Sequence, residues 1–144
     1  MRMKKVYDVE LIKYISLLEN LGKVRIKDLF QYNGMLCCIV DKKDVSLLVG
    51  LEGRKIKKIQ AMLNKKIKVI GYSPDIKDFV KDFIYPIKVD NIEKDNREEN
   101  NNSLILHCKD RETKGLLIGR GGKGLVDLQA AISRYFKIDS IKVK

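Results

Sequence analysis

The sequence predicts an α+β protein built from two consecutive copies of one α-β-β-α-α-β unit, each with a three-stranded sheet packed by helices on one face. Three observations predict this class. The 144-residue chain matches itself at a shift of 69 positions, apolar periods recur in the same order in both halves, and each half holds one Gly-x-x-Gly motif at the same place. We therefore expect two small domains, residues 1–72 and 73–144.

The self-match is strongest around the two glycine motifs. Without a gap, it places Leu47–Arg54 on Leu116–Lys123, and seven of the 28 positions from 36 to 63 are identical to their counterparts. Such a match is suggestive in a short window. It is strengthened because the flanking elements recur in the same order.

In the first copy, apolar residues at helical spacing predict a helix between Val9 and Leu21. Two extended stretches follow, joined by an Asn33-Gly34 pair that is typical of a tight hairpin. A short apolar helix precedes the glycine motif, and a longer helix and a closing strand follow it. The expected ranges are 24–30 and 35–40 for the strands, 45–49 for the short helix and 66–72 for the closing strand.

The second copy repeats this order. Its first helix is expected from the apolar residues between Ile76 and Phe83. The expected ranges of the next elements are 87–92 and 104–108 for the strands, 115–118 for the short helix and 140–144 for the closing strand. The polar stretch 93–103 resembles a linker in composition, but the repeat makes it a long hairpin loop within the second copy. At the joint, Ser73 is expected to cap the next helix, with Pro74 as its first residue.

The excess of positive charge lies mostly in the first copy. The chain has 30 Lys and Arg against 19 Asp and Glu, and of its net charge of +11, +9 belongs to residues 1–72 and +2 to residues 73–144. The segment 54–68 holds seven cations and no acid, with apolar residues on the opposite side of a helix. A charge run is often only a solvated helix face, but this balance favours a polyanionic partner, nucleic acid first and an anionic membrane surface second.

The two glycine motifs, Gly50–Gly53 and Gly119–Gly122, each lie between two predicted helices. Glycines permit positive φ angles and let the main chain approach a ligand closely. The helix that follows directs its unpaired N–H groups at the turn, which favours a phosphate group there. One such motif is weak evidence, whereas two at equivalent points of a repeat predict a nucleic-acid backbone site. The predicted binding residues are Gly50, Leu51, Glu52, Gly53, Arg54, Lys55, Lys57, Lys58, Gly119, Arg120, Gly121, Gly122 and Lys123.

The order of elements and the two motifs resemble the tandem type II (prokaryotic) KH proteins, whose GXXG loop holds about four nucleotides. The joint, with Ile67–Ser73, 75–83 and Tyr85–Val89, is most similar to the small archaeal form of the NusA transcription factors. This resemblance covers essentially the whole chain. It implies binding of single-stranded RNA during transcription elongation, termination or antitermination, in the cytoplasm, with RNA polymerase or other transcription factors as further partners. Similar KH modules also serve in ribosomal RNA processing and ribosome assembly, which is the alternative function.

The two turns are expected to differ in strength. Arg120 and Lys123 place two cations at the second turn, whereas the first turn carries the acid Glu52 at a position where the family often has a cation. A carboxylate beside a phosphate lowers affinity unless it points away. The second turn is therefore predicted to hold the backbone better, and the first copy to supply more nonspecific attraction.

Enzymatic interpretations have little support. Residues 119–124 match the dinucleotide pattern GxGxxG, and Asp139 lies 20 residues after Gly119, where a ribose-binding acid is expected. Too few residues follow, however, for a nucleotide-binding fold. The only histidine, His107, is expected in a strand, and three cysteines without paired spacing predict neither a disulfide framework nor a metal site. We expect no catalysis, no cofactor, no metal, no small-molecule substrate and no membrane span.

Overall fold

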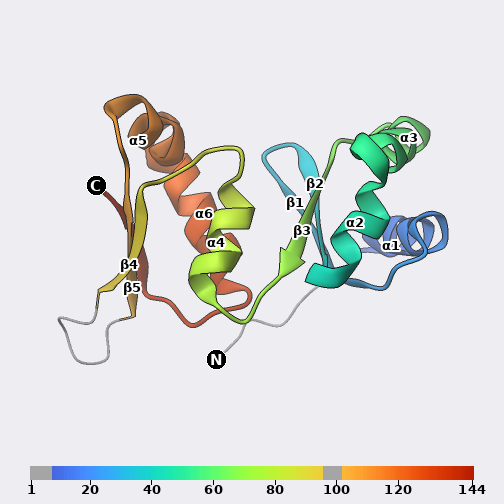
Figure 1. Cartoon of the computed structure of the whole chain (residues 1–144), viewed down its shortest axis with the longest axis horizontal. Helices are drawn as coiled ribbons and strands as arrows, with labels where there is room; N and C mark the ends of the chain where they lie inside the picture. Colours follow the sequence, from blue (N-terminus) through green and yellow to red (C-terminus); the bar gives the residue numbers. More distant parts are fainter. Residues whose placement is uncertain (1–7, 96–101) are drawn as a thin grey trace. The chain divides into compact units, whose positions relative to one another are not determined.

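The computed structural model describes residues 8–95 and 102–144. The chain divides into two compact units, the first ending at Pro74 and the second beginning at Asp75. The described residues form six α-helices and two three-stranded sheets, one sheet in each unit (Figure 1). The predicted α+β class is confirmed. The predicted domain boundary, between residues 72 and 73, lies two residues before this division.

The first unit has the predicted order of elements. Its antiparallel hairpin turns at Asn33 and Gly34, whose φ angles of 51° and 75° are both positive, as a two-residue hairpin loop of this composition requires. The middle strand then pairs in parallel with the closing strand. The elements are α1 (Val9–Gly22), β1 (Ile26–Tyr32), β2 (Met35–Asp41), α2 (Val45–Val49), α3 (Arg54–Leu63) and β3 (Ile67–Tyr72).

The second unit repeats this topology with its own sheet. Its outer strands again flank the middle one, antiparallel on one side and parallel on the other. The elements are α4 (Ile76–Ile84), β4 (Asn91–Asp95), β5 (Ser103–His107), α5 (Arg111–Ile118), α6 (Lys123–Ser133) and β6 (Ser140–Val143).

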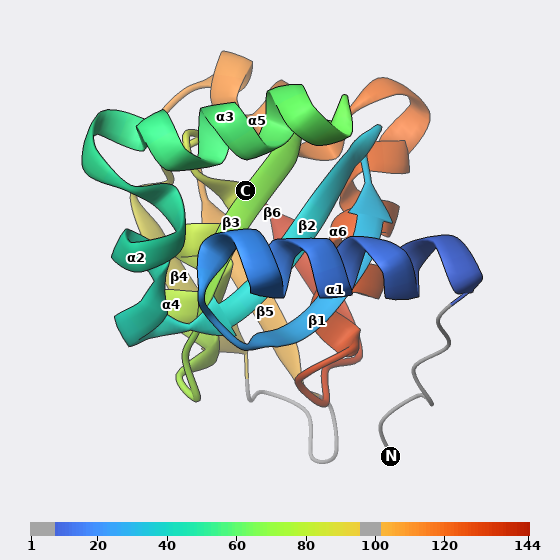
Figure 2. The same cartoon turned by 90° about the vertical axis from the view of Figure 1, so that its right-hand side faces the viewer.

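The hydrophobic core of the first unit lies between its sheet and its helices. Alternate residues of β2 belong to this core because successive side chains of a strand point to opposite faces. Figure 2 shows the three helices of the unit on one side of the sheet. Each helix contributes one nearly inaccessible hydrophobic side chain: Leu18 from α1, Leu48 from α2 and Ile59 from α3.

A repeated glutamine joins the helix after each glycine motif to the closing strand. Gln60 Oε1 accepts a hydrogen bond from Ile67 N at 2.7 Å, and Gln129 Oε1 accepts one from Ile141 N at 3.2 Å. Gln129 also donates through Nε2 to the carbonyl of Asp139 at 3.0 Å. This shared identity of the two copies therefore has a structural cause.

Several local predictions were wrong. The cap of α4 is Asp75, whose carboxylate accepts a hydrogen bond from Lys77 N, rather than Ser73, which is buried. β4 begins at Asn91 rather than at residue 87, and it continues to Asp95 through charged residues. Its partners on β5 set these limits, because pairing runs from Asn91 opposite His107 to Asp95 opposite Ser103.

The short helix before the second motif also extends further than predicted, since it starts at Arg111 with Asp110 as its cap. The predicted hairpin loop 93–103 lies partly in β4, and its residues 96–101 are outside the described residues, as are residues 1–7.

Candidate nucleic-acid interface

The two glycine motifs form turns of the same backbone conformation. The first glycine has φ 77° and ψ 176° at Gly50, and φ 73° and ψ 177° at Gly119. The third residue is left-handed in both turns, with φ 53° and ψ 28° at Glu52 and φ 62° and ψ 20° at Gly121. The last glycine is also left-handed. Corresponding angles agree within about 10°, so the two turns present their main-chain groups in the same way.

The first glycine of each turn is required by a close backbone approach. A Cβ atom on Gly50 would lie 2.5 Å from Lys55 Cβ, and one on Gly119 would lie 2.7 Å from Gly124 N. Both glycines also occupy a backbone region that is essentially restricted to glycine. The turn is therefore folded back tightly on the helix that follows it.

The helices that follow the turns begin without a side-chain cap. Among the helices of at least eight residues in the described chain, α1, α4 and α5 start with an aspartate that accepts a backbone N–H, namely Asp8, Asp75 and Asp110. No side chain caps α3 or α6. Their first turns thus present N–H groups and the positive end of the helix dipole toward the glycine turn, which is an arrangement that binds anions.

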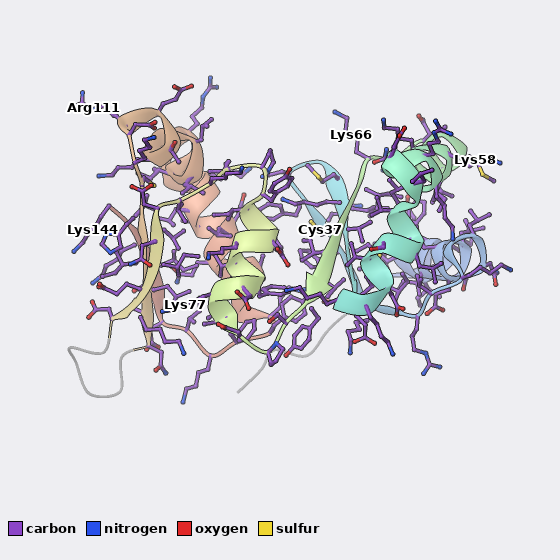
Figure 3. The ribbon with its side chains drawn as sticks, in the orientation of Figure 1. Cys37, Lys58, Lys66, Lys77, Arg111 and Lys144 are labelled. Atoms are coloured by element: carbon purple, nitrogen blue, oxygen red, sulfur yellow. The ribbon has the colours of Figure 1, made fainter. Side chains whose placement is uncertain are left out.

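The cations of the first unit point in different directions. Arg54, Lys57 and Lys58 are exposed on α3, and Lys58 extends outward from the helix (Figure 3). Lys55 instead donates from Nζ to the carbonyl of Gly22, at the end of α1, at 2.8 Å. Its ammonium group is therefore engaged within its own unit.

The acid of the first turn is paired. Glu52 Oε2 lies 3.5 Å from Arg54 Nη2, and both side chains are more than 70% exposed. In the second turn the residue equivalent to Glu52 is Gly121, and the cations Arg120 and Lys123 are exposed on either side of it. The two turns thus share a backbone and differ in charge.

Sequence reasoning did not single out one pair of residues beside the turns. Leu47 on α2 and Leu116 on α5 are equivalent in the repeat, and they are 51% and 61% exposed. Leu51, in the first turn itself, is 77% exposed. An exposed leucine at the same place in both units marks an apolar surface next to each turn. The repeat does match Leu47 to Leu116. The apolar periodicity of so short a helix, however, does not show which of its faces is buried and which is exposed.

The structure does not support the dinucleotide-binding interpretation. The GxGxxG match at 119–124 follows α5 rather than a strand, which the dinucleotide-binding motif requires. Asp139 accepts a hydrogen bond from Asn102 N at 2.7 Å and so helps to fix the start of the closing strand. His107 Nε2 lies 3.9 Å from Glu93 Oε2 across the β4–β5 pair. Within residues 8–95 and 102–144, no group of three or more His, Cys, Asp or Glu could hold a metal ion, and no helix there is long and apolar enough to cross a membrane.

Comparison with known proteins finds archaeal relatives that share one name. No protein-family model matches the chain. It is 26% identical to a Thermoplasma acidophilum protein named "Probable transcription termination protein NusA", over 95% of this chain and 94% of that one. Proteins of the same name from Methanocaldococcus jannaschii and Methanococcus vannielii are each 26% identical, over 93% and 99% of this chain and 72% and 80% of theirs. The predicted resemblance to archaeal NusA proteins is confirmed.

A solved structure supports the fold. The crystal structure of a protein named APE1850 is similar to this chain with a TM-score of 0.71 and 26% identity. The similarity covers 96% of this chain and 100% of that chain.

Proposed function

We propose that this chain is a transcription factor that binds single-stranded RNA through its two glycine turns and acts on the nascent transcript in elongation, termination or antitermination. The observation that carries the proposal is the pair of turns with one backbone conformation, each opening an uncapped helix. The names of the archaeal relatives support the role in transcription.

Binding at each turn uses the main chain first. A phosphate group placed over Gly119–Gly122 accepts hydrogen bonds from amides of the turn and of the first turn of α6 other than those of Gly122 and Lys123, which already donate to the carbonyls of Gly119 and Arg120. Arg120 and Lys123 add charge. The base next to it rests on apolar surface such as Leu116, which is exposed beside the turn. At about four nucleotides per module, the two turns hold roughly eight nucleotides of single strand. RNA polymerase and other transcription factors are the proposed protein partners.

A double substitution at the second turn tests this assignment. Arg120→Asp with Gly121→Asp places two carboxylates where the phosphate is expected, and binding of single-stranded RNA by the second unit should be lost. The matched control is Asn91→Asp with Lys94→Asp, which makes the same change of net charge at two exposed positions of β4. Equal affinity of the two variants would contradict the assignment. The circular dichroism of both variants should remain that of the wild type.

The cellular role is tested by crosslinking. RNA recovered from cells with the wild type, but not with the Arg120→Asp, Gly121→Asp variant, should be enriched in messenger leaders and in sequences near terminators. Enrichment in ribosomal RNA would instead favour a function in ribosome assembly.

A further inference from the structure

We propose that Glu52 determines the order in which the two turns take up RNA: the second turn binds first, and the first turn binds only by displacing the Glu52 carboxylate from Arg54. This inference rests on the proposed function, since it assigns different tasks to the two RNA-binding turns. It makes Glu52 a specificity-determining residue of the first turn.

The backbone comparison isolates the cause. Because the turns agree in φ and ψ within about 10°, their main-chain N–H groups offer an anion the same geometry. Any difference in their binding of phosphate must then arise from the side chains. The relevant contrast is Glu52 in the first turn against Gly121 in the second, since these residues occupy the same left-handed position.

The ion pair between Glu52 and Arg54 explains how Glu52 would weaken phosphate binding at the first turn. Arg54 is the first residue of α3, and its guanidinium lies 3.5 Å from the Glu52 carboxylate. A phosphate at the first turn competes with that carboxylate for the same cation. Lys55 does not compensate, because its ammonium group donates to the Gly22 carbonyl. At the second turn the position equivalent to Glu52 is Gly121, which carries no charge. A phosphate there has no carboxylate of the turn to compete with for Lys123, the residue that corresponds to Arg54.

The pair is weak enough to exchange. Both side chains are largely exposed, 76% for Arg54 and 72% for Glu52, and such surface pairs contribute little to stability. A carboxylate a few ångströms from a phosphate in water lowers affinity by a factor of about three to ten. The first turn is therefore weakened but remains able to bind once the second turn holds the same strand, because that binding step is then intramolecular.

The experiment measures the first turn alone within the full chain. Arg120→Asp with Gly121→Asp disables the second turn, and in this background Glu52→Gln and Glu52→Gly are compared with the parent for binding of a single-stranded RNA of about eight nucleotides. Glu52→Gln removes the charge and keeps the shape, so affinity should rise about three- to tenfold, and the gain should shrink as salt is raised. Glu93→Gln, on β4, makes the same change of net charge away from the turns and should leave affinity unchanged.

The reciprocal variant completes the test. Gly121→Glu in the otherwise unchanged chain should lower affinity for the same RNA by a similar factor, because it places the carboxylate beside the second turn. If Glu52→Gln and Glu93→Gln give the same affinity, or if Gly121→Glu binds like the wild type, the role of Glu52 is wrong while the proposed function stands. If the wild-type chain itself does not bind the RNA, the proposed function fails, and this inference fails with it.

Discussion

Two neighbouring glycines of the second turn should respond very differently to alanine. A methyl group at Gly119 meets two costs: its φ of 73° with ψ of 177° is nearly restricted to glycine, and the new Cβ would lie 2.7 Å from Gly124 N. The backbone cost is about 1–3 kcal/mol and the overlap adds about 1–3 kcal/mol, so Gly119→Ala should lose about 2–6 kcal/mol of unfolding free energy. Gly121 is left-handed with open space around it, and Gly121→Ala should lose only about 1 kcal/mol.

Urea unfolding followed by circular dichroism compares the two variants with the wild type. The repeat supplies an independent copy of the test, because Gly50→Ala in the first turn should behave like Gly119→Ala: its Cβ would lie 2.5 Å from Lys55 Cβ. A loss at Gly119 no larger than that at Gly121 would refute the tight fold of the turn against the following helix.

Three further results are expected. Replacing Gln60 or Gln129 by alanine removes a hydrogen bond to the closing strand of its unit and should cost about 1–2 kcal/mol in urea unfolding, whereas no change would mean that these contacts do not stabilise the strand. The hydrogen bond from the backbone N–H of Thr113 holds the pKa of Asp110 below its ordinary value. The stability that this carboxylate supplies is therefore present above the pKa that Asp110 has in the unfolded chain, and it is lost as pH falls below about 4. The unfolding free energy of an Asp110→Asn variant should depend less on pH in this acid range. Burial raises the pKa of the Cys38 thiol to about 12, so a thiol reagent at neutral pH should modify Cys108 well before Cys38, and equal rates would contradict the burial.

The sequence predicted the features that depend on local chemistry. Asn33-Gly34 specified its hairpin because both residues accept positive φ angles, and the 69-residue register placed both glycine turns because their backbone requires glycine at the first position. The paired side chain of Glu52 was also within reach of sequence reasoning, since its partner Arg54 is only two residues away.

Features that depend on distant partners were not predictable in this way. Lys55 is among the predicted RNA-binding residues, and the sequence did not indicate that its ammonium group donates to the carbonyl of Gly22, 33 residues earlier in the chain. The limits of β4 follow from its pairing with β5 rather than from its own charged sequence. The exposure of Leu116 depends on which face of a short helix the sheet covers, and eight residues of sequence do not determine this.

The most direct test of the account is a nuclear magnetic resonance titration of the ¹⁵N-labelled chain with a single-stranded RNA of about eight nucleotides. The amide resonances of Leu51, Glu52, Arg120 and Gly121 should shift. Shifts confined to the strands, with the amides of both turns unmoved at saturation, would contradict the claim that these turns hold the RNA backbone.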